Sequence, residues 1–256
     1  EIDYKSSLSG KKSNLQNCLI ITLKDSLDIK LFLAIVCTYI DYSKENHYSS
    51  IDIQKFLKDL ELVISKDKKI KKQEVIGAWG ELFFLQELLI KSSKNKYFEI
   101  ISSWEGDNNR THIDFTLKNN KKSFEIKTTT NSHRIHSFKG LEQLTTPHSI
   151  TGYVVSICLL DYDAGQSCFD IYNNIYKLLN TQEDKNLFDK KILLRGKCTK
   201  NKNYKFMINK IKPIKFFLFE TIPSPEISEG IIKVQWDVSL ENINNDNSVI
   251  LKNIID

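Results

Sequence analysis

The chain contains few of the residues that interrupt regular structure: 9 glycines and 4 prolines among 256 residues. Low-complexity tracts are absent, and 41% of the residues are hydrophobic. Disordered and fibrous proteins have the opposite composition. A chain of this length and composition is expected to fold as one large domain or two small ones, each with a hydrophobic core.

Pairs of cysteines at metal-binding spacing are also missing. The sequence has no CxxC motif, and its cysteines are far apart, at Cys18, Cys37, Cys158, Cys168 and Cys198. His133 and His136 could form a zinc pair, but a third and a fourth ligand are not nearby. Thiols among apolar residues are typical of reduced, buried cysteines in cytosolic proteins. The longest apolar run, at 31–40, is too short to span a bilayer. No signal peptide is visible, so we expect a cytoplasmic protein without a membrane partner.

Arginine is scarce, since only Arg110, Arg134 and Arg195 occur and all other basic residues are lysines. The net charge is +5 and the isoelectric point about 8.7. This balance permits a polyanionic partner without requiring one. Abundant isoleucine and asparagine accompany the lysines, which is typical of AT-rich coding sequence. The lysine content is therefore not taken as an indication of nucleic-acid binding.

Hydrophobic periodicity predicts a chain in two parts. Residues 1–70 are expected to form an accessory α/β region. Its expected elements are a strand and two helices, at 17–23, 28–42 and 50–65. A lysine cluster at 66–72, interpreted as a solvated connector, leads to the main domain at residues 71–256.

The main domain is expected to contain a mixed central β-sheet flanked by helices. Helical spacing of apolar residues predicts helices at 73–91, 167–180 and 184–194. Apolar runs predict strands at 98–104, 112–117, 123–128, 152–160, 204–220 with an interruption at Pro213, and 231–238. The nearly continuous apolar run at 152–160 is typical of a central strand covered on both faces. Residues 132–145 are interpreted as a polar turn or helix.

The most informative segment is the hairpin at 112–128. A two-residue turn at Asn119-Asn120 would pair residues whose numbers sum to 239, so that Ile113 faces Ile126 and Phe115 faces Phe124. Strand side chains alternate between faces. The opposite face therefore carries Asp114 directly across from Glu125.

Asp114 and Glu125 would then lie about 5 Å apart and repel each other. A divalent cation between them would remove the penalty, because hard cations take carboxylate oxygens. Mg²⁺, or Mn²⁺ in its place, could be held by these two residues and the backbone carbonyl of Ile126. Such an ion supports phosphodiester hydrolysis. Lys127 is placed to orient or deprotonate the attacking water and to stabilise charge.

Glu81 is a further candidate ligand, in the predicted helix at 73–91. Gly77 and Gly80 each cost this helix about 1 kcal/mol relative to alanine. Close packing against the hairpin would explain the glycines and bring Glu81 toward the metal. A solvated helix glutamate is the alternative.

Candidate substrate-binding residues follow the hairpin. Thr129 extends the polar face of the second strand, and Gln143 could face the site from a helix. Arg134 and Lys139 could clamp phosphates, which guanidinium and ammonium groups commonly bind. A solvated loop after the strand is the alternative interpretation.

The spacing of Asp114, Glu125 and Lys127 resembles that of the PD-(D/E)xK nuclease superfamily. More narrowly, the chain is similar to an uncharacterised bacterial branch found beside restriction and phage-defence genes. The matching segments are 77–82, 112–115, 125–129, 134–137 and 143–144. The resemblance implies a restriction-endonuclease-like αβββαβ core and a divalent metal, with Glu81 as the helix carboxylate that some members add. Ile113 replaces the proline of the superfamily pattern.

This resemblance implies a metal-dependent DNA endonuclease of the restriction or phage-defence type. Cutting both strands of a duplex would need two sites, so a homodimer or a complex with other defence-system subunits is expected. A catalytically silent DNA-binding or scaffolding subunit of such a complex is the main alternative. A nuclease directed at RNA is a third, which would require contacts to the 2′-hydroxyl.

Overall fold

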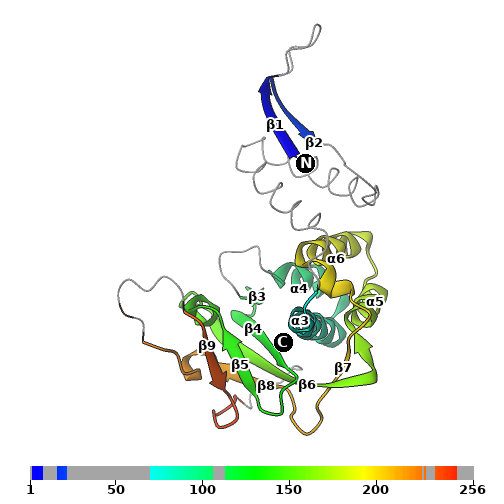
Figure 1. Cartoon of the computed structure of the whole chain (residues 1–256). Coiled ribbons are helices and arrows are strands. Elements are labelled where there is room, and N and C mark those ends of the chain that lie inside the picture. Colours follow the sequence, from blue (N-terminus) through cyan, green and yellow to red (C-terminus); the bar gives the residue numbers. More distant parts are fainter. Residues whose placement is uncertain are drawn as a thin grey trace. The chain divides into compact units, whose positions relative to one another are not determined.

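The computed structural model describes residues 2–7, 16–21, 70–105, 113–226, 228 and 234–246 (Figure 1). The chain divides into two units, residues 1–64 and 65–256. In the first unit, β1 (Ile2–Ser7) pairs antiparallel with β2 (Gln16–Ile21), where the sequence predicts a strand. The helices predicted at 28–42 and 50–65 lie outside the described residues.

A five-stranded mixed sheet forms the centre of the second unit. Its order is β3-β4-β6-β7, and β8 also pairs with β6. The strands are β3 (Phe115–Leu117), β4 (Lys122–Thr129), β6 (Thr151–Ser167), β7 (Lys205–Ile208) and β8 (Lys215–Leu218). Within this sheet, the β4–β6 pair is parallel and the other described pairs are antiparallel. A second, two-stranded sheet joins β5 (Ile135–Phe138) to β9 (Trp236–Ser239).

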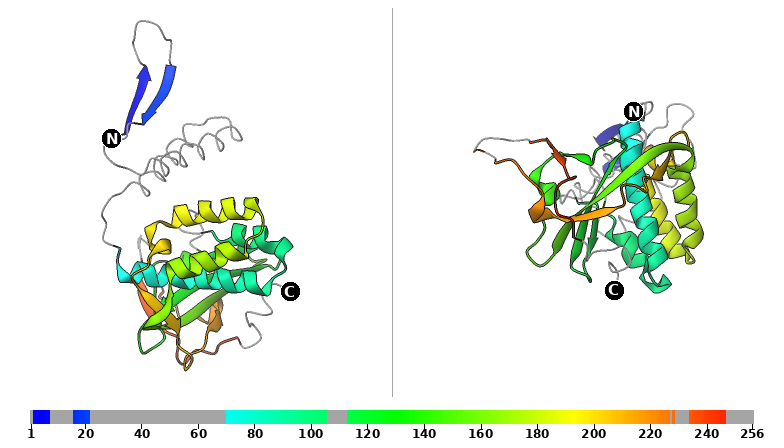
Figure 2. Two further views of the ribbon diagram at one scale, coloured as in Figure 1. Left: turned by 90° about the vertical axis from the view of Figure 1, so that its right-hand side faces the viewer. Right: turned by 90° about the horizontal axis from the view of Figure 1, so that it is seen from below.

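Helices cover one face of the central sheet (Figure 2). They are α3 (Lys72–Lys91), α4 (Tyr97–Ser103), α5 (Cys168–Leu178) and α6 (Gln182–Arg195). Ser167 and Thr181 begin α5 and α6 by accepting hydrogen bonds from backbone N–H groups, as N-cap residues do. This arrangement confirms the mixed central sheet flanked by helices of a restriction-endonuclease-like fold. None of the helices in the described ranges has the length and apolar character needed to cross a bilayer.

Residues 152–159 of β6 are buried on both faces, as their apolar run predicts, whereas the following residues 160–164 are exposed. Val155 belongs to the larger core cluster, between the sheet and the helices, while Val154 belongs to a smaller cluster on the other face. The smaller cluster includes Phe138 of β5 and Val238 of β9. The two-stranded sheet therefore covers the face of the central sheet that the helices leave open.

The strand predicted at 98–104 is wrong, because residues 98–103 belong to α4 and Trp104 is its C-cap residue. Tyr97, Ile100, Ile101 and Trp104 are buried, and their spacing is that of one helix face. The polar turn or helix predicted at 132–145 is also partly wrong, since it contains β5 before the short helix η3 (Leu141–Leu144). Burial alternates along β5, which is the pattern of a strand.

The hairpin has the predicted register for the pairs that the structure forms. Phe115 pairs with Phe124, and the ladder ends at Leu117 and Lys122. The N–H of Lys121 closes the turn by donating to the carbonyl of Lys118 at 3.1 Å. The first strand is shorter than predicted, because β3 begins only at Phe115, and His112 lies outside the described residues.

The predicted pairing of Ile113 with Ile126 is wrong. The chain bends at Asp114, and Ile113 enters the smaller core cluster while Ile126 belongs to the larger one. Asp114 and Glu125 are therefore neighbours beyond the end of the ladder and not a ladder pair.

Gly80 explains how α3 lies so close to β4. A Cβ at position 80 would be 1.9 Å from Thr128 Oγ1 and 3.1 Å from Thr128 Cβ. A Cβ at Gly77 would meet nothing within 4 Å. The packing explanation therefore holds for Gly80 and does not extend to Gly77.

Substituting these two glycines gives a matched pair of stability tests. We expect Gly80→Ala to cost about 1–3 kcal/mol, because overpacking must push α3 away from β4. Gly77→Ala should instead stabilise the protein by about 1 kcal/mol through helix propensity. Thermal unfolding measures both, at about 2–4 °C per kcal/mol. A stabilising Gly80→Ala would contradict the close approach.

Candidate active site

Three acidic side chains meet at the edge of the sheet where β3 begins: Glu81 of α3, Asp114 before β3, and Glu125 of β4. Since the β3–β4 ladder stops at Phe115, the N–H of Ile126 donates to Asp114 Oδ2 at 2.7 Å. A paired strand residue directs its N–H and its C=O to the same edge. The carbonyl of Ile126 is therefore oriented toward the edge occupied by Asp114.

Glu125 is held by two neighbours that also contact each other. Its Oε1 atom accepts hydrogen bonds from Lys127 Nζ and from Gln143 Nε2, both at 2.9 Å. Gln143 Oε1 accepts from Lys127 Nζ at 3.1 Å, and the ammonium lies 4.7 Å from the centroid of the Phe138 ring. The structure thus brings Gln143 to the site from η3 and fixes the position of the Lys127 ammonium.

The second oxygen of Glu125, Oε2, is buried and has no hydrogen-bond partner. Burial raises the pKa of Glu125 well above its usual value, the nearby Asp114 raises it further, and Lys127 opposes the shift. Burial also raises the pKa of Asp114, opposed by Arg195 and by the Ile126 N–H. Desolvated carboxylates with a bare oxygen are costly unless a cation compensates them. These oxygen donors fit Mg²⁺ or Mn²⁺, which prefer such ligands.

Arg195, at the end of α6, is the residue that sequence reasoning missed. One nitrogen of its guanidinium contacts Glu81 Oε2 and also lies 3.0 Å from Asp114 Oδ1. Trp104 Nε1 donates to the same Glu81 oxygen at 2.9 Å. Glu81 is therefore paired with the arginine that also contacts Asp114, and its role as a metal ligand stays a prediction.

The Arg195 guanidinium bridges Glu81 and Asp114. Over the described ranges, no three His, Cys, Asp or Glu side chains are close enough together to hold one metal ion. The described residues therefore also offer no third ligand to a zinc pair of His133 and His136.

The composition of the chain contains a signal for Arg195. In a chain whose basic residues are nearly all lysines, an arginine marks a position where a planar, multiply donating group is used.

Arg134 does not clamp a phosphate, and that prediction is wrong. Its side chain is 1% exposed. Nη1 donates to the carbonyl oxygen and to Oγ of Ser156, and Nη2 to the carbonyl of Pro213, each at 2.8 Å. The guanidinium therefore joins β6 to the segment before β8 inside the protein.

Substrate binding by Thr129 and Lys139 stays a prediction. Thr129 is buried, and its Oγ1 accepts the N–H of Asn131 at 3.1 Å. Lys139 is exposed, and its backbone N–H donates to Gln143 Oε1 at 2.9 Å. Lys139 thus supports the carboxamide that contacts Glu125 and Lys127.

His136 is buried beside the site, with Nε2 2.5 Å from Ser156 Oγ. Burial, with the positive charges of Lys127 and Arg134, lowers the pKa of His136 to about 3. The unfolded chain binds the proton near pH 6.5, while the folded chain binds it only near pH 3. Stability should therefore fall as the pH drops below about 6.5.

Urea unfolding between neutral and acidic pH tests this expectation. His136 should contribute at most about 1.4 kcal/mol per pH unit. His136→Gln should remove that part of the slope, whereas His133→Gln, at an exposed histidine, should leave the slope unchanged. Equal slopes in both variants would show that His136 is not the group responsible.

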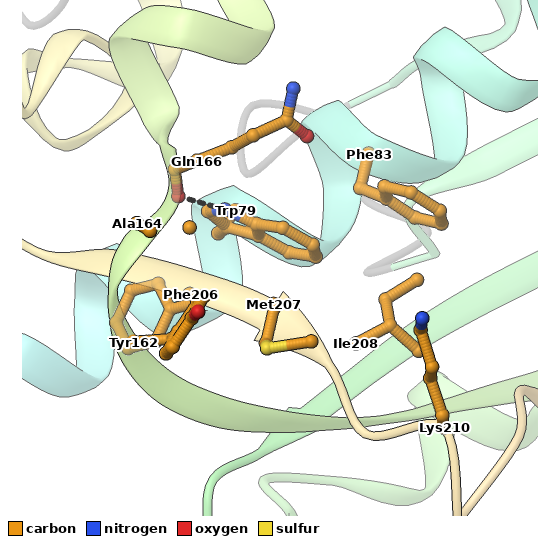
Figure 3. Close-up of a pocket in the computed structure, with 10 residues that line it drawn as sticks. Trp79, Phe83, Tyr162, Ala164, Gln166, Phe206, Met207, Ile208 and Lys210 are labelled. Atoms are coloured by element: carbon orange, nitrogen blue, oxygen red, sulfur yellow. Dashed lines mark hydrogen bonds between the residues drawn. The ribbon is translucent and has the colours of Figure 1, made fainter.

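A separate apolar pocket is lined by residues of α3, β6 and β7 (Figure 3). It has a volume of about 380 Å³, and Trp79, Phe83, Phe206 and Met207 contribute to its walls. Trp79 Nε1 donates to the carbonyl of Gln166 at 2.8 Å. Among the described residues, no acidic side chain or histidine lines this pocket, so these walls do not offer the groups that hydrolysis requires.

Comparison with known proteins identifies one family. A family model described as "Putative PD-(D/E)XK family member, (DUF4420)" matches residues 3–241. No curated protein and no solved structure matches the chain.

Proposed function

The chain belongs to the DUF4420 family, described with the PD-(D/E)XK proteins, and on that premise we propose that it is a metal-dependent DNA endonuclease of a restriction or phage-defence system. The observation that carries the proposal is the bare, buried Oε2 of Glu125. This oxygen lies in a site that also holds Asp114 and an ammonium group fixed by two hydrogen-bonded partners. The large majority of buried polar atoms in proteins are hydrogen-bonded, so an unpaired carboxylate oxygen in this site supports a bound cation.

The roles of the side chains follow from their positions. Asp114, Glu125 and the carbonyl of Ile126 would hold Mg²⁺ or Mn²⁺, which when bound supplies an activated water and neutralises phosphate charge. Lys127 orients the attacking water, accepts its proton when in the neutral form, and stabilises the charge that develops on the phosphate. Gln143 holds the Lys127 nitrogen and the Glu125 carboxylate in position by hydrogen bonding to both.

Cleavage assays with the wild-type protein test the proposal. Supercoiled plasmid, single-stranded DNA and RNA are each incubated with Mg²⁺, Mn²⁺ or EDTA. We expect DNA to be cut with either metal and to remain intact in EDTA. Cleavage of RNA alone would contradict the proposed substrate, and cleavage in EDTA would contradict the proposed chemistry.

A catalytically silent DNA-binding or scaffolding subunit is the second candidate. The pairing of Arg195 with Asp114 and Glu81 favours it, because this pairing neutralises two of the carboxylates without a metal. Calorimetric binding of Mn²⁺, together with intact DNA and RNA in every assay, would support the silent subunit. Whether nuclease or silent subunit, the protein would act in the cytoplasm, as a homodimer or bound to other subunits of a defence system.

A further inference from the structure

One long stretch of the chain is rich in basic residues and lacks acidic ones. Residues 190–219 contain ten Lys or Arg residues and no Asp or Glu. The rest of the chain has 27 basic and 32 acidic residues. The net charge of +5 therefore originates in one segment, which runs from the end of α6 through η4 (Lys197–Lys200) to β8.

Part of this segment meets a row of aromatic rings on α5. Phe169, Tyr172 and Tyr176 have the i, i+3, i+7 spacing of one helix face. The ring centroids of Phe169 and Tyr172 are 6.2 Å apart, and those of Tyr172 and Tyr176 are 5.8 Å apart. All three residues are half-buried, so each ring keeps an accessible part.

A lysine ammonium lies over each of these rings. The distances from Nζ to the ring centroids are 4.1 Å for Lys202 over Phe169, 4.5 Å for Lys200 over Tyr172 and 5.2 Å for Lys185 over Tyr176. These distances are within the range of cation–π attraction. The six residues are called the lysine–aromatic row below.

The ammonium groups of the row are not neutralised by carboxylates. Lys200 and Lys202 are exposed, and among the described residues no ion pair involves either of them or Lys185. Three acidic groups of the two helices have other partners. Asp170 and Asp184 accept hydrogen bonds at the starts of α5 and α6, and Asp189 accepts one from the Tyr172 hydroxyl. The row therefore presents three cations to solvent.

A short stretch of chain joins the row to the candidate active site. Arg195 contacts Asp114, and η4, which carries Lys200, begins two residues later. This short helix contacts both α3, which carries Glu81, and α5, which carries the rings. A polyanion bound along the row would thus pass close to η4, which follows Arg195 and its contact with Asp114.

We propose that the lysine–aromatic row binds the phosphate backbone of a nucleic-acid strand that leads to the candidate active site. The destination of the strand rests on the proposed nuclease function. Three cations along one helix face suit a ligand with regularly repeated single charges, and contacts to phosphates release condensed counterions. The rings hold the ammonium groups in place, which reduces the entropy lost on binding.

Fluorescence anisotropy of a labelled single-stranded oligonucleotide tests the row. The measurement is made in EDTA, at several salt concentrations, so that cleavage does not interfere. The row variant is Lys185→Gln with Lys200→Gln and Lys202→Gln. The control variant is Lys94→Gln with Lys118→Gln and Lys121→Gln, which removes the same charge from exposed positions outside the row.

We expect the row variant to bind more weakly. The slope of log K against log salt should become less steep by about 2, from about 0.7 per lost phosphate contact. The control variant should retain the wild-type slope. Equal losses in both variants, or no loss in either, would overturn the inference. If the wild type binds through the row but cleaves nothing in Mg²⁺ or Mn²⁺, the row stands and the proposed nuclease function fails. If the wild type cleaves DNA and the row variant binds as tightly as the wild type, the nuclease function stands and the row fails.

Discussion

Lys127→Ala is expected to lower the rate of metal-dependent DNA cleavage by about 100- to 10,000-fold. This is the usual loss when a side chain that transfers a proton in the transition state is removed. The ammonium is positioned by Glu125 at 2.9 Å and Gln143 at 3.1 Å. No other lysine or arginine is described in contact with Glu125. Steady-state cleavage of plasmid at saturating Mg²⁺ measures the loss.

This experiment must separate chemistry from metal binding. Lys127 lowers the pKa of Glu125, so its removal should leave that carboxyl protonated to higher pH and weaken metal binding there. Saturating metal and alkaline pH correct for this effect, and a loss that disappears under these conditions would contradict a role in the chemical step. Lys118→Ala is the matched control, because Lys118 is an exposed lysine at the turn of the same hairpin. It should cleave like the wild type.

Arg195→Ala is expected to tighten Mn²⁺ binding by about 10- to 100-fold. A metal ion and the Arg195 guanidinium compete for Asp114 and Glu81, and a hydrogen bond to a charged group contributes about 1.5–3 kcal/mol. Titration calorimetry with Mn²⁺ measures the change directly and does not depend on cleavage. Weaker binding in the variant would show instead that Arg195 holds the carboxylates in the geometry that the metal requires.

Stability in EDTA provides a second readout for Arg195. Removing one partner of a buried charge pair costs about 3–5 kcal/mol, so the metal-free variant should unfold at a lower temperature than the wild type. Mn²⁺ should then restore more stability to the variant than to the wild type. Lys190→Ala, at an exposed position of the same helix, should change neither the metal affinity nor the response to EDTA.

The hairpin shows what local sequence can predict. Its register follows from the Phe115–Phe124 pair and from the asparagines at the turn, all within a short stretch of chain. The failure at Ile113 has a different origin. Its burial depends on Phe138 and Val238, which belong to a second sheet formed with the distant strand β9. Alternation along one strand contains no information about such a partner.

The arginines show the same limit at the site. Arg195 reaches Asp114 across 81 positions of sequence, and Arg134 bonds to Pro213 across 79. Neither contact can be derived from spacing, because both depend on how α6 and β8 return to the sheet. The misread strand at 98–104 is a different kind of error. Tyr97, Ile100 and Ile101 have the spacing of a helix, whereas the density of apolar residues in this stretch favours a strand.

The hydrogen bond from Ile126 to Asp114 has a consequence for solubility. A backbone N–H at the end of a strand ladder can recruit a strand from another molecule, and here a carboxylate occupies that donor. Asp114→Ala would free this donor for pairing with another molecule, and the resulting self-association would appear as lost activity in a cleavage assay. Asp114→Asn keeps an oxygen that can accept the same hydrogen bond. The side chain that we propose as a cation ligand therefore also occupies the backbone donor at the end of the ladder.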